Sequence, residues 1–129
     1  MRRIFLIRIA LIAGVAIFAA LTAYQRMSGM IPDATDPDAL RTLQMIQYAS
    51  WAYSAFAVVL AFYFRSRVEA ARSEQEIHTA LIIGWAPAEG AALLAVVQYF
   101  LGAPLATMAV GVLAFAVVLL LLPIPDTRN

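Results

Sequence analysis

The sequence predicts an all-α integral membrane protein whose four transmembrane helices form an antiparallel bundle. Hydrophobic residues make up 64% of the 129 residues and charged residues only 13%, whereas a soluble domain carries about 25% charged residues. Four apolar segments are each near or above the ~20 residues that a helix needs to cross a bilayer. We expect a single membrane domain, residues 1–129, with helices at about 4–24, 37–65, 77–101 and 104–122.

The first apolar segment follows Arg2 and Arg3, which gives it the charge pattern of a secretory signal peptide. Its apolar run is longer than the usual 7–15 residues of such a peptide, and Leu21 stands where cleavage after Ala23 would need a small residue. We therefore expect a retained anchor helix. The Arg8 side chain, one turn into this helix, is expected to extend to the interface.

The second helix is expected to begin outside the membrane. It follows a polar loop, residues 25–36, at whose end Asp36 is suited to cap a helix. Pro37 fits the first helical position, and Asp38 favours the positive end of the helix. A helix over 37–65 has about 29 residues and a length of ~43 Å, which exceeds the ~30 Å hydrocarbon core. Its first turns should project into water or lie tilted at the interface.

The other two connections are a charged loop and a tight turn. Residues 65–76 read RSRVEAARSEQE and are expected to form a charged hairpin loop, partly helical as an extension of the second helix. Gly102 can end the third helix and Pro104 can begin the fourth, so these helices should pair in antiparallel orientation. Pro123 and Pro125 end the fourth helix.

The arginine distribution predicts the orientation in the membrane. With four spans, seven of the nine arginines lie on the side of the two termini and the 65–76 loop, and two lie on the side of the 25–36 loop. The first group is Arg2, Arg3, Arg8, Arg65, Arg67, Arg72 and Arg128, and the second is Arg26 and Arg41. The positive-inside rule then places both termini in the cytoplasm. We expect a bacterial inner (cytoplasmic) membrane.

Glu89 lies close to the midpoint of the third apolar segment and is the first candidate for a functional residue. A charged residue at the bilayer centre costs roughly 2.5–3.5 kcal/mol on insertion scales, so a partner or a function must offset that cost. Pro87 has no N–H, which leaves the Ile83 carbonyl without its helical donor and predicts a kink. Gly84 and Gly90 flank this kink and permit close approach of another helix.

The second helix is the expected partner of Glu89 because it carries the most polar residues. An antiparallel hairpin around residues 65–76 pairs positions whose numbers sum to about 143, which puts Ser54 and Tyr53 at the depth of Glu89. We predict a hydrogen bond from one of these hydroxyls to Glu89, within a protomer or between protomers. With the Ile83 carbonyl, these groups form a candidate site for a proton or a monovalent cation.

A simpler interpretation is that Glu89 stays protonated and bonds a neighbouring helix as part of the packing. The only histidine, His78, is expected at the cytoplasmic interface. The sequence has no cysteine, nucleophile motif, glycine-rich phosphate loop, catalytic carboxylate pair or metal-ligand cluster. We therefore expect no enzyme activity, no cofactor and no metal. The net charge of +1 gives no case for nucleic acid binding.

Residues 69–76 read EAARSEQE and residues 81–101 read LIIGWAPAEGAALLAVVQYFL. This part of the chain, within residues 65–101, resembles the ion-carrying hairpin of rotary ATPase proteolipids, the subunit c family. Its loop matches at Arg72 and Glu76, and its carboxylate-bearing helix matches at Gly84, Ala86 and Glu89. The resemblance implies that Glu89 is a reversible proton or cation carrier. The first helix of that family is glycine-striped, whereas residues 50–64 contain no glycine, so the resemblance does not extend to ring assembly.

The small size, the lack of a soluble domain and two nearly featureless helices favour a non-catalytic accessory subunit. Such a subunit would dock through its helices to a larger membrane complex, so the expected partners are lipid and other membrane subunits or further copies of the chain. The alternative is a proton- or cation-binding membrane subunit with Glu89 as carrier. A third possibility is a small proton-coupled exporter, similar to the small multidrug-resistance exporters, in which the essential glutamate lies in the first helix.

Overall fold

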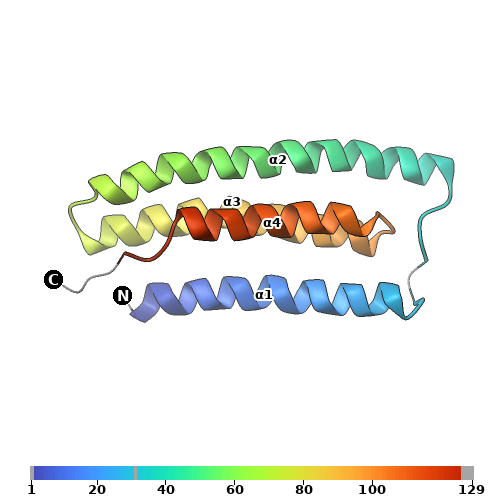
Figure 1. Cartoon of the computed structure of the whole chain (residues 1–129), viewed down its shortest axis with the longest axis horizontal. Helices are drawn as coiled ribbons and strands as arrows, with labels where there is room; N and C mark the ends of the chain where they lie inside the picture. Colours follow the sequence, from blue (N-terminus) through green and yellow to red (C-terminus); the bar gives the residue numbers. More distant parts are fainter. Residues whose placement is uncertain (1, 31, 126–129) are drawn as a thin grey trace.

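The computed structural model describes residues 2–30 and 32–125, and this part of the chain is all-helical, as predicted. The helices are α1 (Arg2–Met27), α2 (Pro37–Ala70), α3 (Glu74–Phe100) and α4 (Leu105–Leu121). In Figure 1, α2 and α1 lie on opposite sides of a middle layer formed by α3 and α4. The start of α1, the end of α4 and the α2–α3 connection lie at one end of the molecule, and the other two connections lie at the opposite end (Figure 1).

Three of the four helices, α1, α2 and α3, are long and apolar enough to cross a membrane, which indicates membrane residence. The fourth apolar segment also forms a helix, but α4 has only 17 residues. At 1.5 Å per residue it is about 26 Å long, somewhat shorter than the ~30 Å hydrocarbon core of a bilayer. The four predicted segments are therefore all helical, and the last is shorter than we expected for a span.

The predicted start of α2 is confirmed, but its predicted end is not. The Asp36 side chain accepts a hydrogen bond from the Asp38 N–H at 3.2 Å, and Pro37 occupies the first turn. At its other end α2 continues to Ala70 rather than ending near residue 65. Arg65 and Glu69 form an ion pair of 3.5 Å within this extension, at the i,i+4 spacing that supports a helix.

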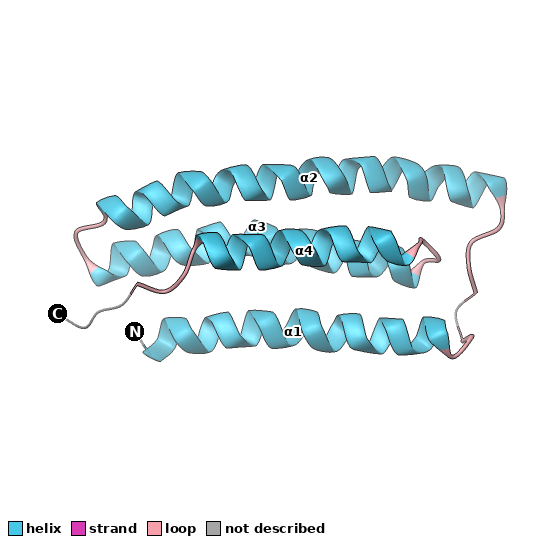
Figure 2. Ribbon diagram, in the orientation of Figure 1, coloured by secondary structure: helices cyan, strands magenta, loops and turns pink. Residues whose placement is uncertain are grey.

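The start of α3 also lies earlier than predicted, at Glu74 rather than near residue 77. The Ser73 hydroxyl accepts the Glu76 N–H at 3.2 Å, and the Glu76 carboxylate accepts the Arg72 N–H at 2.9 Å. This is close to a capping box, in which a serine and a glutamate three residues later satisfy the free N–H groups at a helix start. The charged loop therefore shrinks to residues 71–73, a short connection in Figure 2.

The central helix is α3, which packs against each of the other three helices. Its closest neighbour is α4, at Gly111. A Cβ at this glycine would overlap the Ala95 side chain and lie 2.9 Å from the Ala91 carbonyl oxygen. Small residues at such contacts let two helix backbones approach each other within a membrane. On α3 the buried small residues are Gly84, Ala88, Ala91, Ala92 and Ala95.

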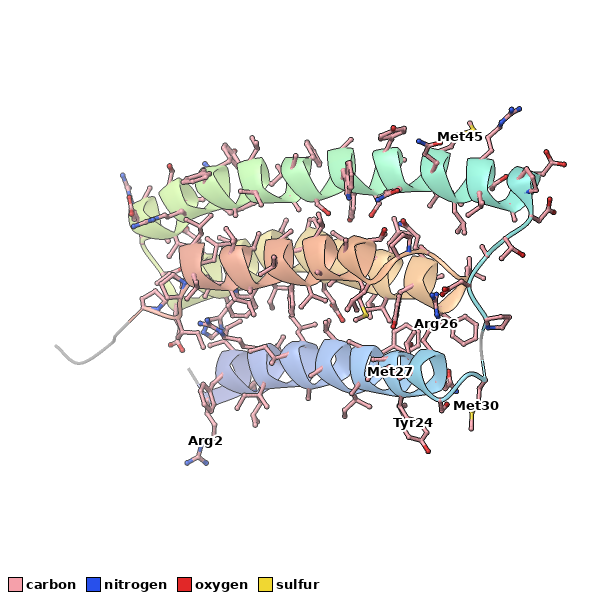
Figure 3. The ribbon with its side chains drawn as sticks, turned by 45° about the vertical axis from the view of Figure 1, so that its right-hand side comes forward. Arg2, Tyr24, Arg26, Met27, Met30 and Met45 are labelled. Carbon is pink, nitrogen blue, oxygen red and sulfur yellow. The ribbon has the colours of Figure 1, made fainter. Side chains whose placement is uncertain are left out.

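An arginine at each end of α1 connects this helix to α3 and α4. Arg8 donates a hydrogen bond to the Leu119 carbonyl oxygen at 2.9 Å, near the end of α4, and its expected place at the membrane interface stays a prediction. Arg26 donates to the carbonyl oxygens of Tyr99 and Ala103 at the α3–α4 turn, and Figure 3 shows it between α1 and that turn. Both cations thus lie near the C-terminal end of a helix, where the helix dipole favours positive charge.

Candidate functional site

Glu89 lies at the edge of the buried side of α3, and its side chain is half-buried. Trp85 precedes it by four residues and Tyr99 follows it by ten, which places all three on neighbouring parts of one helix face. The Arg8 guanidinium lies 5.7 Å from the centre of the Trp85 ring, and the Arg26 guanidinium lies 4.5 Å from the centre of the Tyr99 ring. The part of α3 that carries Trp85 and Tyr99 is therefore turned towards α1, and Glu89 lies at the edge of this part.

The neighbouring side chains on the other side of Glu89 are open to the surroundings. Ile82 and Val97 are each 39% exposed, and Ala86 is exposed. Within the described part of the chain, Glu89 takes part in no hydrogen bond and no ion pair. A carboxyl group in the middle of an apolar helix thus lies at the outer surface of the bundle, without a bonded partner among residues 2–30 and 32–125.

The two expected partners of Glu89 lie on α2 at the right depth but on other sides of α3. The Tyr53 hydroxyl oxygen lies 3.1 Å from where a Cβ of Gly90 would be, whereas the Ser54 hydroxyl is buried without a hydrogen-bond partner. Phe64 of α2 packs against Gly84, about 140° around the helix from Glu89 at 100° per residue. No hydrogen bond joins Tyr53 or Ser54 to Glu89 among the described residues; a bond between protomers stays a prediction.

The residues around the expected kink have different surroundings. Gly84 is a contact point of three helices, because a Cβ there would overlap the Leu122 side chain and lie 3.3 Å from the Phe64 Cβ. Pro87 is half-buried within α3, which runs unbroken from Glu74 to Phe100. The Ile83 side chain is 47% exposed and lines a cavity near the α2–α3 connection. Gly84 and Gly90 thus permit close contacts with α2, while Ile83 and Glu89 face outward.

A second polar feature lies inside the bundle, and the sequence interpretation recognises only one of its members. Ser54 of α2, Gln98 of α3 and Thr107 of α4 are 4%, 1% and 1% exposed. Their side-chain oxygen and nitrogen atoms have no hydrogen-bond partner in the described part of the chain. A buried polar group without a partner costs about 1–3 kcal/mol, and ordered water commonly supplies the missing bonds.

Two of these three side chains lie at one level of the α3–α4 hairpin. Because Gly111 packs against Ala95, Thr107 and Gln98, each about one turn closer to the connection, fall at the same depth. An opening of about 260 Å³ begins one further turn along, beside Pro104, and α2 contributes Gln47 to its lining. In the sequence, the signal for this feature is a polar residue on the buried side of each of the helices α2, α3 and α4.

The described residues contain no group of three His, Asp or Glu side chains that could hold a metal ion. Comparison with protein-family models, with curated proteins and with solved structures finds no match to this chain. The resemblance to the proteolipid hairpin therefore stays a prediction. Any functional assignment rests on the site itself, and Glu89 at the outer surface of α3 is its most informative group.

Proposed function

We propose that this protein is a small non-catalytic accessory subunit of a larger membrane complex. In this proposal its helices form an antiparallel transmembrane bundle in a bacterial inner membrane, with both termini in the cytoplasm, as the arginine distribution favours. The subunit docks through the outer side of α3. We call this surface the Glu89 face and define it by Ile82, Ala86, Glu89, Leu93 and Val97.

The observation that carries the proposal is the half-buried Glu89 carboxyl group, which has no bonded partner in the described part of the chain. In hydrocarbon such a group costs about 2.5–3.5 kcal/mol on insertion scales. A hydrogen-bond donor or a cation on a helix of another subunit would offset that cost. The expected partner is therefore a membrane helix that carries such a group at mid-depth.

The side chains next to Glu89 suit the approach of a helix. Ala86 and Gly90 lie within one turn of it, and small residues let two helix backbones come close in a membrane. The Tyr53 hydroxyl borders Gly90 and offers a second polar group to an incoming chain. Interhelical hydrogen bonds of this kind are worth about 1–2 kcal/mol in model peptides, so the surrounding packing must contribute the rest of the affinity.

Site-specific photo-crosslinking in native membranes tests the docking surface. A photoreactive residue at Ala86 or Leu93, one turn to either side of Glu89, is expected to give one discrete protein adduct. The same residue at Ile17, which is 61% exposed on α1, is the matched control and should give lipid adducts only. Glu89→Leu should lower the adduct yield about tenfold, since it removes an interhelical hydrogen bond worth about 1–2 kcal/mol. An unchanged yield would remove Glu89 from the interface.

A second candidate function is a subunit that binds and releases a proton or cation at Glu89. The half-exposure of this carboxyl group favours it, because a carrier must be reached by its ion. Carbodiimide modification in native membranes, with Glu89→Gln as the blank, separates the two functions. Labelling of Glu89 that falls as the pH rises, and that one cation blocks, supports the proton or cation carrier. If Glu89 is not labelled at any pH and the Glu89→Gln variant assembles normally, the result supports the accessory subunit.

A further inference from the structure

A cavity lies away from Glu89, between the end of α2 and the start of α3. Its volume is about 760 Å³. The lining changes in character along the cavity, from polar and charged residues at the α2–α3 connection to apolar residues within the two helices. The polar part includes Arg67, Arg72 and Ser73, and the apolar part includes Phe64, Ala80 and Ile83.

The two arginines that line this cavity have no carboxylate partner within the described residues, although acidic residues are close in sequence. The acidic side chains are already engaged: Glu69 with Arg65 at 3.5 Å, Glu74 with His78 at 3.4 Å, and Glu76 with the backbone N–H of Arg72 at 2.9 Å. The Arg67 guanidinium lies 6.0 Å from the centre of the Tyr63 ring and can still donate its N–H groups. The polar end of the cavity therefore carries two arginines against one carboxylate, that of Glu76, which leaves a formal net charge of +1.

We propose that this cavity binds one anionic phospholipid, with the phosphate at Arg67 and Arg72 and an acyl chain along Phe64 and Ile83. The planar fork of N–H groups on arginine matches the oxygens of a phosphate. Basic pockets between membrane helices are sites where anionic head groups bind. Two guanidinium groups beside one engaged carboxylate favour a head group with a net negative charge over a zwitterionic one. The apolar part of the lining favours a lipid over free phosphate.

The test uses the full chain in phosphatidylcholine nanodiscs and spin-labelled phosphatidylglycerol as the probe. The motionally restricted fraction of the probe gives its association constant relative to spin-labelled phosphatidylcholine. We expect the double substitution Arg67→Gln and Arg72→Gln to lower this ratio about tenfold or more, since each charge-assisted hydrogen bond from arginine to the phosphate contributes about tenfold or more. The control is Arg2→Gln with Arg3→Gln, two exposed arginines at the same end of the molecule, which removes the same net charge outside the cavity and should change the ratio less than twofold.

A second pair of measurements separates a lipid site from an anion site. Ile83→Trp fills the apolar part of the cavity and should weaken binding of the lipid, and millimolar inorganic phosphate should not displace it. An equal loss in the two double variants would mean diffuse attraction of anionic lipid and would overturn the proposal. So would displacement by inorganic phosphate. If Ile83→Trp does not fold, the matched arginine variants and the phosphate competition decide the question alone.

Discussion

The contact of Arg26 with the α3–α4 turn leads to a quantitative prediction of stability. Its guanidinium donates to the carbonyl oxygens of Tyr99 and Ala103 and pairs with Asp33. The Arg26 side chain is 8% exposed and the Asp33 side chain 81%. The contacts of Arg26 with the two carbonyl oxygens are therefore buried, whereas its contact with Asp33 is exposed on the Asp33 side. Substitutions of Arg26 and of Asp33 should then differ in their effect on stability.

The magnitude follows from the bonds that Arg26→Gln removes. Two hydrogen bonds from a charged donor contribute about 1.5–3 kcal/mol each, and a cation over an aromatic ring adds about 0.5–1 kcal/mol. The Tyr99 oxygen keeps a second donor, the Gly102 N–H at 3.1 Å, which limits the loss. We therefore expect Arg26→Gln to lower the free energy of unfolding by about 3–4 kcal/mol. Asp33→Asn removes only an exposed ion pair, worth about 0–1 kcal/mol.

Reversible unfolding in mixed micelles of dodecyl maltoside and sodium dodecyl sulfate, followed by circular dichroism, measures both differences. Arg26→Lys should fall between the two variants, because lysine keeps the charge but lacks the planar fork of donors. If Arg26→Gln and Asp33→Asn lie within about 1 kcal/mol of each other, the carbonyl contacts do not carry the stability, and the reasoning fails.

Two further predictions concern the helix contacts and the buried polar groups. Gly111→Val should lower the free energy of unfolding by about 1–3 kcal/mol through overpacking. Gly14→Val is the control, because nothing lies within 4 Å of the new Cβ, and it should change stability by no more than about 0.5 kcal/mol. Equal effects of the two variants in micelle unfolding would contradict the close α3–α4 contact. In this chain without native cysteine, Ser54→Cys and Thr107→Cys should react with a small water-soluble thiol reagent, because water supplies the missing hydrogen bonds. Ala61→Cys, at a fully buried apolar position, should not react, and equal labelling of all three positions would refute the difference.

The location of the helices could be predicted from the sequence because apolar length and capping residues are local signals. Asp36 and Pro37 marked the start of α2 correctly. The end of α2 and the start of α3 were harder, because charged residues belong equally well to a loop or to an exposed helix end. The ion pair of Arg65 with Glu69 stabilises the last turns of α2 as helix, and the cap formed by Ser73 stabilises the first turn of α3. Both signals lie in the sequence at i,i+4 and i,i+3 spacing.

The faces of the helices could not be predicted in the same way. Counting residues from a hairpin turn gives depth, and Tyr53 does lie close to Gly90, as the sum of about 143 requires. It does not give the side of α3 on which α2 packs, because that depends on the positions of α1 and α4. Ser54 therefore faces the interior while Glu89 lies near α1 and the outer surface. The burial of Gln98 and Thr107 inside the bundle could not be predicted for the same reason.

The short fourth helix ends in carbonyl groups that need hydrogen-bond donors from elsewhere in the bundle. A Cβ on Gly84 would overlap Leu122, so the end of α4 lies beside Gly84. From this point α3 continues back to Glu74, ten residues or ~15 Å further towards the end of the bundle. If α3 spans a bilayer, the last carbonyl groups of α4 lie at a depth where water cannot serve as their donor. Each unsatisfied group would cost several kcal/mol there.

Donors from the neighbouring helices bind two of these carbonyl groups. Arg8 of α1 binds the Leu119 carbonyl oxygen at 2.9 Å, and the Trp85 indole N–H of α3 binds the Leu122 carbonyl oxygen at 3.0 Å. The prolines at 123 and 125 have no N–H to satisfy, and Leu122 itself is buried within the protein. Irregular backbone is tolerated at membrane depth only under such cover. An arginine about two turns inside α1 is therefore part of what allows α4 to stop early, which makes α1 a structural part of the bundle.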